Sequence, residues 1–251
     1  MIDDYFTPLN SSLIKGLIPK ELNNPFELTT PEVCNIAAKK LQQYITETEH
    51  TWVHNFGTNK RKTGPIKGKM FGVLIVENAN KELGFLSAFS GKLDQDDFKN
   101  IFVPSLFDTS VEDYFLDKGM GELTLLCNQI DQLKEENSNS TELQRLKLIR
   151  KNKSFALQQK IFDQYVFLNN SGNLKDIRTI FKDFSGKKPA AGAGECAAPK
   201  LFHYAFKNNL KPLAIAEFWW GKTTYKDKKH LVFYPACEDK CRPILNYMLS
   251  L

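Results

Sequence analysis

Three cysteines in the last quarter of this 251-residue chain have the spacing of metal ligands. Cys196 lies in the stretch Gly-Glu-Cys-Ala-Ala-Pro, and Cys237 and Cys241 follow in Tyr-Pro-Ala-Cys-Glu-Asp-Lys-Cys. A spacing of four predicts that Cys237 and Cys241 share one helix face near the helix N-terminus, where the helix dipole favours thiolates. A thiolate from a second helix start completes three corners of a tetrahedral zinc site, which requires sulfur atoms roughly 3.5–4 Å apart.

Two simpler interpretations of these cysteines stay open. The chain can have a zinc-binding fold that has lost its metal, or the three thiols can be packing residues, since a free cysteine behaves as a small hydrophobe. Cys34 and Cys127 fall in apolar helical stripes, and we expect them to be packing residues. An odd total of five cysteines, without a signal-like N-terminus, predicts a reducing, cytoplasmic location with free thiols. No apolar run approaches the ~18 residues of a membrane helix, so we expect no membrane partner.

The elements around these cysteines predict an α/β body. Two apolar runs, 70–76 and 83–89, flank a short Asn-rich turn, which indicates a β-hairpin covered on both faces. A Gly/Ala/Pro-rich linker at 185–194 precedes a helix over 195–207, strands over 213–218 and 231–234, and a closing helix over 238–249. Near the N-terminus, a helix is expected with Thr30 as N-cap and Pro31 as its first residue.

These elements divide the chain into three parts. An N-terminal arm and helix occupy 1–56, and the α/β body comprises 57–121 and 185–251. Between the two stretches of the body, apolar residues recur every three or four positions over 122–166, interrupted by Asn-Ser-Asn-Ser. This pattern predicts an inserted helical hairpin resembling an antiparallel coiled coil. Its charges predict solvated faces, with contact to a protein partner or to RNA as the alternative.

The order of hairpin, cysteine-bearing helix, strand and Pro-x-Cys-x-x-x-Cys helix resembles the cytidine-deaminase-like fold. The resemblance implies a three-layer α/β sandwich in which one helix brings [His/Cys]-x-Glu and the next brings Pro-Cys-x-x-Cys. Zinc then activates a water, and the glutamate shuttles protons. Here Cys196 matches the first ligand, but Ala198 stands where the glutamate is expected, and three residues separate the cysteine pair instead of two. Glu195 and Glu217 are the candidate catalytic replacements.

Basic residues gather in two loops of a chain whose formal net charge is +5. The first loop, 57–69, contains no acidic residue, and the second follows two adjacent tryptophans. Phosphate contacts from the loops and base stacking by the tryptophans predict an RNA-binding surface. The candidate RNA-binding residues are Lys60, Arg61, Lys62, Lys67, Lys69, Trp219, Trp220, Lys226, Lys228 and Lys229. The alternative for the tryptophan pair is a place in the core.

Segments along nearly the whole chain, in the same order, resemble the N-terminal extension of a subset of bacterial RluA-type RNA pseudouridine synthases. The most specific are Trp-Trp-Gly at 219–221 and Tyr-Pro-Ala-Cys at 234–237. The others are 24–45, 52–57, 68–76, 83–93, 102–108, 194–201 and the residues that adjoin the two specific blocks.

The resemblance implies a role near uridine isomerisation in ribosomal or transfer RNA. The catalytic signature of that family, His-Arg-Leu-Asp-x-x-Thr-Ser-Gly, does not occur in this chain, so its aspartate is assigned to no residue. We therefore expect an accessory RNA-binding or scaffolding module, whose partners are RNA and a pseudouridine synthase catalytic domain in cis or in trans. The alternatives are a zinc-dependent deaminase-like enzyme, a structural zinc domain, and a protein-interaction module that uses the helical hairpin.

Overall fold

The computed structural model describes residues 4–93, 100–106, 109–136, 140–222 and 228–250. The chain forms two compact units. The body comprises Met1–Leu106 and Phe167–Leu251, and the helical arm comprises Phe107–Val166. Both sequence stretches that carry the candidate cysteines therefore belong to the body.

The centre of the body is a five-stranded antiparallel sheet with the order β1-β3-β2-β6-β7. Its strands are β1 (Thr7–Pro8), β2 (Lys69–Glu77), β3 (Leu83–Phe89), β6 (Lys211–Trp220) and β7 (Phe233–Tyr234). Six consecutive residues are buried in both β2 and β3, which is the pattern of strands covered on both faces. The expected β-hairpin is confirmed, and the mixed α/β class with it.

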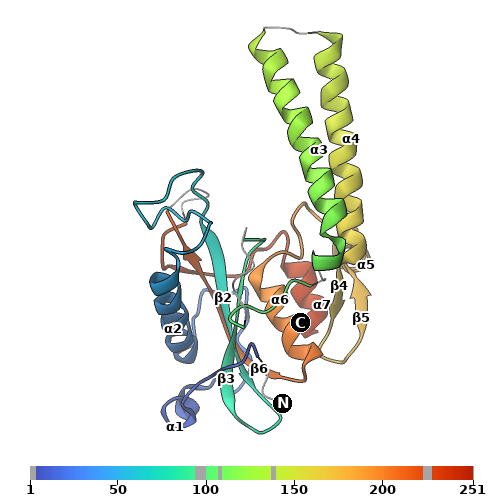
Figure 1. Cartoon of the computed structure of the whole chain (residues 1–251). Coiled ribbons are helices and arrows are strands. Elements are labelled where there is room, and N and C mark those ends of the chain that lie inside the picture. The colour runs from blue at the N-terminus through green and yellow to red at the C-terminus, as the bar shows by residue number, and fades with distance from the viewer. Residues whose placement is uncertain (1–3, 94–99, 107–108, 137–139, 223–227, 251) are drawn as a thin grey trace. The chain divides into compact units, whose positions relative to one another are not determined.

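Helices cover the two faces of this sheet (Figure 1). Helix α2 (Glu32–Thr48) contacts β2 and β6 on one face, and α6 (Ala197–Lys207) contacts β2, β3 and β6 on the other. Helix α7 (Arg242–Leu249) packs on α6. The α2 side holds a large apolar cluster that includes Val33, Phe71 and Phe218.

The alternation of β6 sends neighbouring side chains to opposite faces. Phe218 and Trp220 belong to the cluster that packs on α2. Because successive residues of a strand face opposite sides, Glu217 and Trp219 point toward α6. A carboxylate is thereby placed on the face of the sheet that α6 covers.

Three helix starts differ from the prediction. Pro31 is the N-cap of α2 rather than its first residue, and its extended ψ of 142° excludes it and Thr30 from the helix. Helix α6 begins at Ala197, with Cys196 as its N-cap. Helix α7 begins at Arg242, four residues later than expected, and Pro243 fits its first turn because the missing N–H has no partner there.

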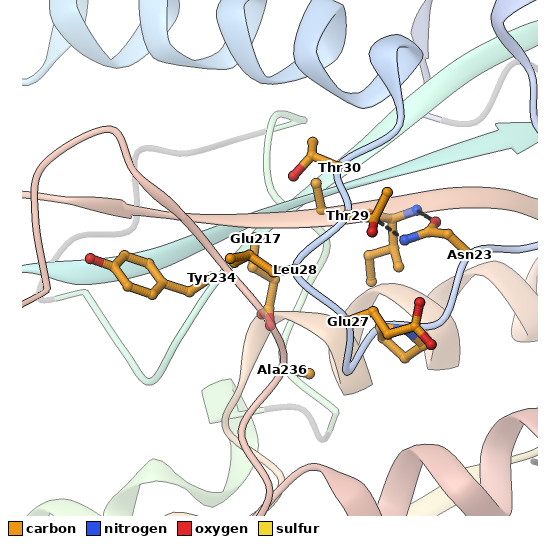
Figure 2. A pocket seen from close by; sticks show the side chains of 11 residues that line it. Asn23, Glu27, Leu28, Thr29, Thr30, Glu217, Tyr234 and Ala236 are labelled. Carbon is orange, nitrogen blue, oxygen red and sulfur yellow. Dashed lines mark hydrogen bonds between the residues drawn. The ribbon is translucent and has the colours of Figure 1, made fainter.

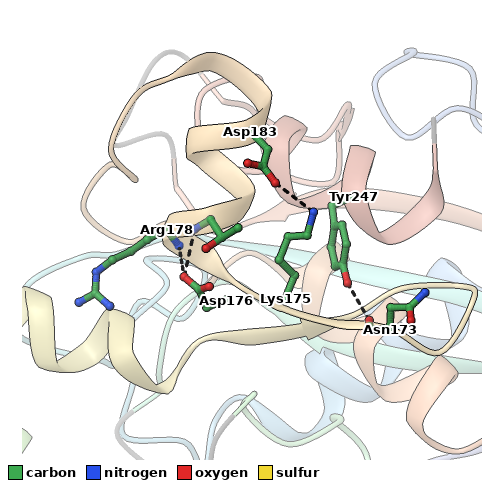
Figure 3. Close-up of polar contacts among 7 residues, drawn as sticks. Asn173, Lys175, Asp176, Arg178, Asp183 and Tyr247 are labelled. Atoms are coloured by element: carbon green, nitrogen blue, oxygen red, sulfur yellow. Dashed lines mark hydrogen bonds and ion pairs between the residues drawn. The ribbon is translucent and has the colours of Figure 1, made fainter.

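Polar contacts near the C-terminus fix α7 against the segment that follows the arm (Figure 3). The Asp176 carboxylate accepts from the backbone N–H groups at the start of α5 (Ile177–Ser185), and Lys175 pairs with Asp183 at 3.0 Å. Tyr247 of α7 donates its hydroxyl to the Asn173 carbonyl at 2.7 Å.

Lys175 lies in β5 (Leu174–Asp176), which pairs with β4 (Val166–Leu168). The N-terminal segment adds α1 (Ser11–Ile14) and a 3-10 helix (Lys15–Leu17).

The helical arm consists of α3 (Thr109–Glu135) and α4 (Thr141–Gln164). The hairpin expected over 122–166 is present, but its first helix begins at Thr109, so the predicted end of the body segment at 121 is too late. Ile130, Leu143 and Leu146 form the apolar contact between the two helices. Ser140 caps α4, because its hydroxyl accepts from the Leu143 N–H at 3.2 Å.

Candidate metal centre

A glycine-containing turn delivers Cys196 to the start of α6. Gly192 and Gly194 both have left-handed backbone angles, with φ of +73° and +92°. Glycine adopts such angles without the steric penalty of a Cβ atom. Cys196 then takes the extended conformation of an N-cap, and its side chain makes no capping hydrogen bond. The thiol is therefore free to point toward other groups.

Cys237 and Cys241 lie on a single turn that leads into α7. The Cys237 carbonyl accepts from the backbone N–H groups of Cys241 and Arg242, at 3.1 and 3.2 Å. Cys241 is the N-cap of α7, so the predicted placement of both cysteines on a helix face is wrong. The turn nevertheless keeps the two thiols adjacent because it has nearly helical hydrogen bonding.

The sulfur atoms of the three cysteines converge. Sγ of Cys237 lies 3.8 Å from Sγ of Cys196 and 3.2 Å from Sγ of Cys241, and all three atoms are within 4.8 Å of one another. Cys241 is buried, Cys196 is half-buried and Cys237 is exposed. All three are free thiols, and the cluster could hold a metal ion.

The three thiols share their protons unequally. The hydrogen-bonding contacts with Cys196 and Cys241 lower the pKa of Cys237. The same contacts with Cys237 help raise the pKa of Cys196 and Cys241, which are also buried. Binding of a metal ion by all three sulfur atoms would require each of them to be a thiolate.

Glu217 approaches the first turn of α6. It is 7% exposed, and its Oε1 accepts from the Ala198 N–H at 3.1 Å. Burial, followed by the charge of Cys237, raises the pKa of Glu217 to about 7. Ala198 is the residue two positions after Cys196, so the carboxylate of Glu217 lies at the backbone of the position where a deaminase-like motif has its glutamate.

Gly72 allows this close approach. A Cβ atom at Gly72 would lie 3.1 Å from Cβ of Ala197 and 3.5 Å from Cγ of Glu217. Because Gly72 has no side chain, α6 can pack closely against the sheet next to the carboxylate of Glu217.

Glu195, the other candidate carboxylate, is engaged elsewhere. Its Oε2 lies 3.6 Å from the Lys200 ammonium, and its backbone carbonyl accepts from the Gly91 N–H at 2.7 Å. Within the part of the chain that the structure describes, the metal-ligand group contains the three cysteines and no carboxylate. Of the two candidates, Glu217 is the one whose side chain is bonded to the first turn of α6, which directly follows Cys196.

A small hollow opens beside Glu217 (Figure 2). Tyr234 and Ala236 border it on one side, and the N-terminal segment 23–30 on the other. This segment is attached by backbone and side-chain contacts: the Pro25 carbonyl accepts from the Ala236 N–H at 2.9 Å, and Asn23 pairs with the backbone of Ile215. Sequence reasoning missed this role, because nothing in a Pro/Asn-rich arm indicates which distant strand it contacts.

The two basic loops adjoin. The Lys222 N–H donates to the Phe56 carbonyl at 2.8 Å, and Cβ of Lys222 would lie 2.9 Å from a Cβ at Gly57. Lys60, Arg61, Lys67, Lys222 and Lys229 are exposed. Both loops therefore expose cationic side chains, and they touch each other at Lys222 and Gly57.

Other candidate RNA-binding residues have internal contacts. The Lys62 ammonium donates to the carbonyls of Trp52 and His54, and Lys69 donates to the Lys92 carbonyl at 2.8 Å. Lys228 lies over the Tyr234 ring, 3.8 Å from its centroid. Lys226 lies outside the described residues.

The tryptophan pair belongs to the interior. Trp219 and Trp220 are 6% and 3% exposed, so their rings are not available to stack on a base, and the prediction of that role is wrong. Trp220 donates its indole N–H to Glu49 at 2.8 Å. The core interpretation of the pair is the one that the structure supports, because a long β6 strand carries both residues into the sheet.

No protein-family model, curated protein or solved structure matches this chain. In the part of the chain that the structure describes, no helix has the length and apolar character of a membrane span.

Proposed function

We propose that the body is a zinc-dependent enzyme domain of deaminase-like architecture. In this proposal Cys196, Cys237 and Cys241 bind one zinc ion, and Glu217 carries protons beside it. The observation that supports it best is the convergence of three thiols from two separate helix starts, with all sulfur atoms within 4.8 Å.

The donor set suits zinc. Thiolates are soft ligands that favour zinc over magnesium or calcium, and sulfur separations of 3.8 and 3.2 Å are close to the roughly 3.5–4 Å expected of two ligands on one tetrahedral zinc. The described residues supply three ligands to the group rather than four. Zinc held by three protein ligands keeps one position for water or substrate and lowers the pKa of that water.

Glu217 supplies the proton-transfer group that Ala198 cannot. Its Oε1 is bonded to the Ala198 N–H, and the proposal assigns the exchange of protons to Oε2. In hydrolytic deamination, a water adds to the carbon that bears the amino group, and ammonia leaves. The Oε2 of Glu217 would accept a proton from the attacking water and return it to the departing amine.

Elemental analysis of the purified chain tests the metal site. We expect close to one zinc per chain, lost on Cys196→Ser, Cys237→Ser or Cys241→Ser. Cys34→Ser is the matched control, since Cys34 is a buried thiol on α2 outside the cluster. A wild-type chain that takes up no zinc at any tested concentration would contradict the proposal.

Ammonia release from cytidine, adenosine and short single-stranded RNA tests the enzyme. Glu217→Gln should keep the zinc and the hydrogen bond from Ala198, but lose the release of ammonia. Zinc binding without release from any of these compounds would leave a structural zinc domain and refute the catalytic part.

A second candidate function is an accessory RNA-binding module for a pseudouridine synthase catalytic domain, in cis or in trans. The two basic loops favour it, because both expose cations and the Lys222 N–H donates to the carbonyl of Phe56, which directly precedes the first loop. Phosphate contacts of this kind make affinity depend steeply on salt.

Binding of ribosomal or transfer RNA fragments tests this candidate. Replacing Lys60, Arg61 and Lys67 by alanine should weaken binding and reduce the salt dependence. The control replaces three exposed lysines remote in sequence, Lys20, Lys39 and Lys40, and makes the same change in net charge. Equal losses in both variants would show only a non-specific charge effect.

A further inference from the structure

Lys200 is a buried lysine on the first turns of α6, four residues after Cys196. Its side chain is 5% exposed, and burial lowers its pKa. The ammonium donates to the carbonyls of Phe89 and Gly91, at 3.1 and 2.8 Å, and lies 3.6 Å from Oε2 of Glu195. A lysine is seldom buried unless it is paired, so this ammonium is held in place by three oxygen atoms.

These contacts converge on the segment that presents Cys196. Gly91 accepts from the Lys200 ammonium and also donates its N–H to the carbonyl of Glu195, the residue directly before Cys196. Gly91 itself has a φ of +69°, which a glycine adopts without strain. The turn after β3, the cysteine-bearing segment and α6 are therefore joined through a single ammonium.

We propose that Lys200 is a positioning residue for the zinc site, which rests on the proposed function above. It holds the Glu195–Cys196 segment in the conformation that brings Cys196 to the other two thiols. Its charge also helps balance the site, because three thiolates around a dication carry a net negative charge, and a cation in a poorly solvated region offsets it. A residue that only filled space would supply neither effect.

Zinc affinity of Lys200→Met, measured by competition with a chelator, tests the inference. Methionine keeps much of the length and apolar contact of the side chain but lacks the charge and the N–H donors. We expect zinc affinity to fall by about tenfold or more, as for other groups that orient a metal ligand. The thiolate-to-cobalt absorption of the cobalt(II)-substituted protein should change as well, which a loss of fold stability alone would not cause.

Ala205→Gly is the control for stability. Ala205 is buried in α6, and glycine there weakens the helix without touching the ammonium or the thiols. Its zinc affinity should stay within about twofold of wild type. If Lys200→Met yields too little folded protein, Lys200→Gln makes the same comparison, because it keeps an N–H donor for the carbonyls and lacks the charge.

The outcomes separate this inference from the zinc site itself. Wild-type affinity and cobalt spectrum in Lys200→Met or Lys200→Gln would overturn the positioning role while the zinc site stands. Equal loss of affinity in Ala205→Gly would overturn it too, since stability would then explain the effect. A wild-type chain that binds no zinc would contradict both the zinc site and the positioning role of Lys200.

Discussion

Gly72 is a single residue whose missing side chain lets three elements meet beside the cysteines. A Cβ atom there would lie 3.0 Å from Leu201 and 3.1 Å from Ala197. Gly72→Val should therefore push α6 from the sheet, lower the free energy of unfolding by about 1–3 kcal/mol and weaken zinc binding. Chemical denaturation and chelator competition measure the two effects.

Gly16 provides the comparison for this substitution. A Cβ atom at Gly16 would have no neighbouring atom within 4 Å, so Gly16→Val should leave zinc affinity unchanged. Equal zinc affinity in the Gly72 variant and in wild type would show that the approach of α6 to the sheet does not set the thiol geometry.

His203 should make the body sensitive to acid. Its Nδ1 accepts from the Leu168 N–H at 3.3 Å, and burial, followed by Lys207, lowers its pKa to about 4. The folded state thus favours neutral histidine, so stability is complete above the unfolded pKa of about 6.5 and declines as pH falls toward 4. Between pH 7 and pH 5, wild type should lose about 1–2 kcal/mol more than His203→Gln in urea denaturation, allowing for partial solvent exposure.

Because wild type and His203→Gln share the three thiols, any loss of proposed zinc in acid is common to both, and the difference between them isolates the histidine. His50→Gln, at an exposed position, is the control for the replacement of a histidine by glutamine. Identical pH dependence in wild type and His203→Gln would refute the assignment.

The sequence was sufficient to predict that the three cysteines lie together. Each lies at or near a helix start, and an error of a few residues in a helix boundary does not change that. They were not enough to choose between Glu195 and Glu217. That choice depends on which strand lies under α6 and on which face of β6 each residue points, and both follow from long-range packing. Lys200 escaped notice for the same reason, because its partners Phe89 and Gly91 are about 110 positions away in sequence.

Among the elements, the segment 23–25 pairs with β6 at Ile215 in the way that a neighbouring strand would. Asn23 donates to the Ile215 carbonyl at 3.0 Å and accepts from the Ile215 N–H at 2.8 Å, so its amide imitates a paired backbone. Asn23→Ala removes both bonds from partly buried backbone groups and should lower the free energy of unfolding by about 1–3 kcal/mol. Asn152→Ala, at an exposed site in α4, should cost less than half a kcal/mol, roughly the range of surface substitutions.

Thermal and urea unfolding of the two variants compare these effects directly. A second readout is zinc exchange, because the Pro25 carbonyl holds the Ala236 N–H next to Cys237. Faster zinc exchange in Asn23→Ala would link the N-terminal segment to the metal centre. An Asn23 variant as stable as the Asn152 variant would rule out the strand-like pairing.

Continuous apolar runs identified the β-hairpin of β2 and β3, which is buried on both faces. Apolar residues at helical spacing identified α2 and the helical arm. The predicted helix starts were wrong by one to four residues, because capping and turn contacts decide where a helix begins. A proline residue suits either the N-cap or the first helical position, and its ψ of 142° places Pro31 outside the helix. The turn before α7 has hydrogen bonds so nearly helical that the sequence cannot distinguish it from a first turn. The basic loop next to Trp219 and Trp220 also suggested surface tryptophans, whereas both rings follow β6 into the interior.

Across the whole molecule, positive charge belongs to the body. Residues 107–166 contain ten acidic and eight basic side chains, so the formal net charge of +5 arises elsewhere in the chain. The three thiols, Glu217 and both basic loops also lie in the body. Each function proposed for this chain therefore depends on the body, while a protein-interaction role would depend on the helical arm.

Replacing residues 107–166 by a flexible Gly-Ser linker separates these roles. Because the body is a compact unit of its own, the shortened chain should fold, bind one zinc and show the same salt dependence of RNA binding as the full chain, since that dependence follows the number of phosphate contacts. Circular dichroism, elemental analysis and RNA titrations at several salt concentrations provide the measurements. Loss of RNA binding with zinc retained would assign phosphate contacts to the basic residues of α4, and loss of the fold would show that the body needs the arm. Loss of association with a pseudouridine synthase domain alone would make the arm the surface that recruits it.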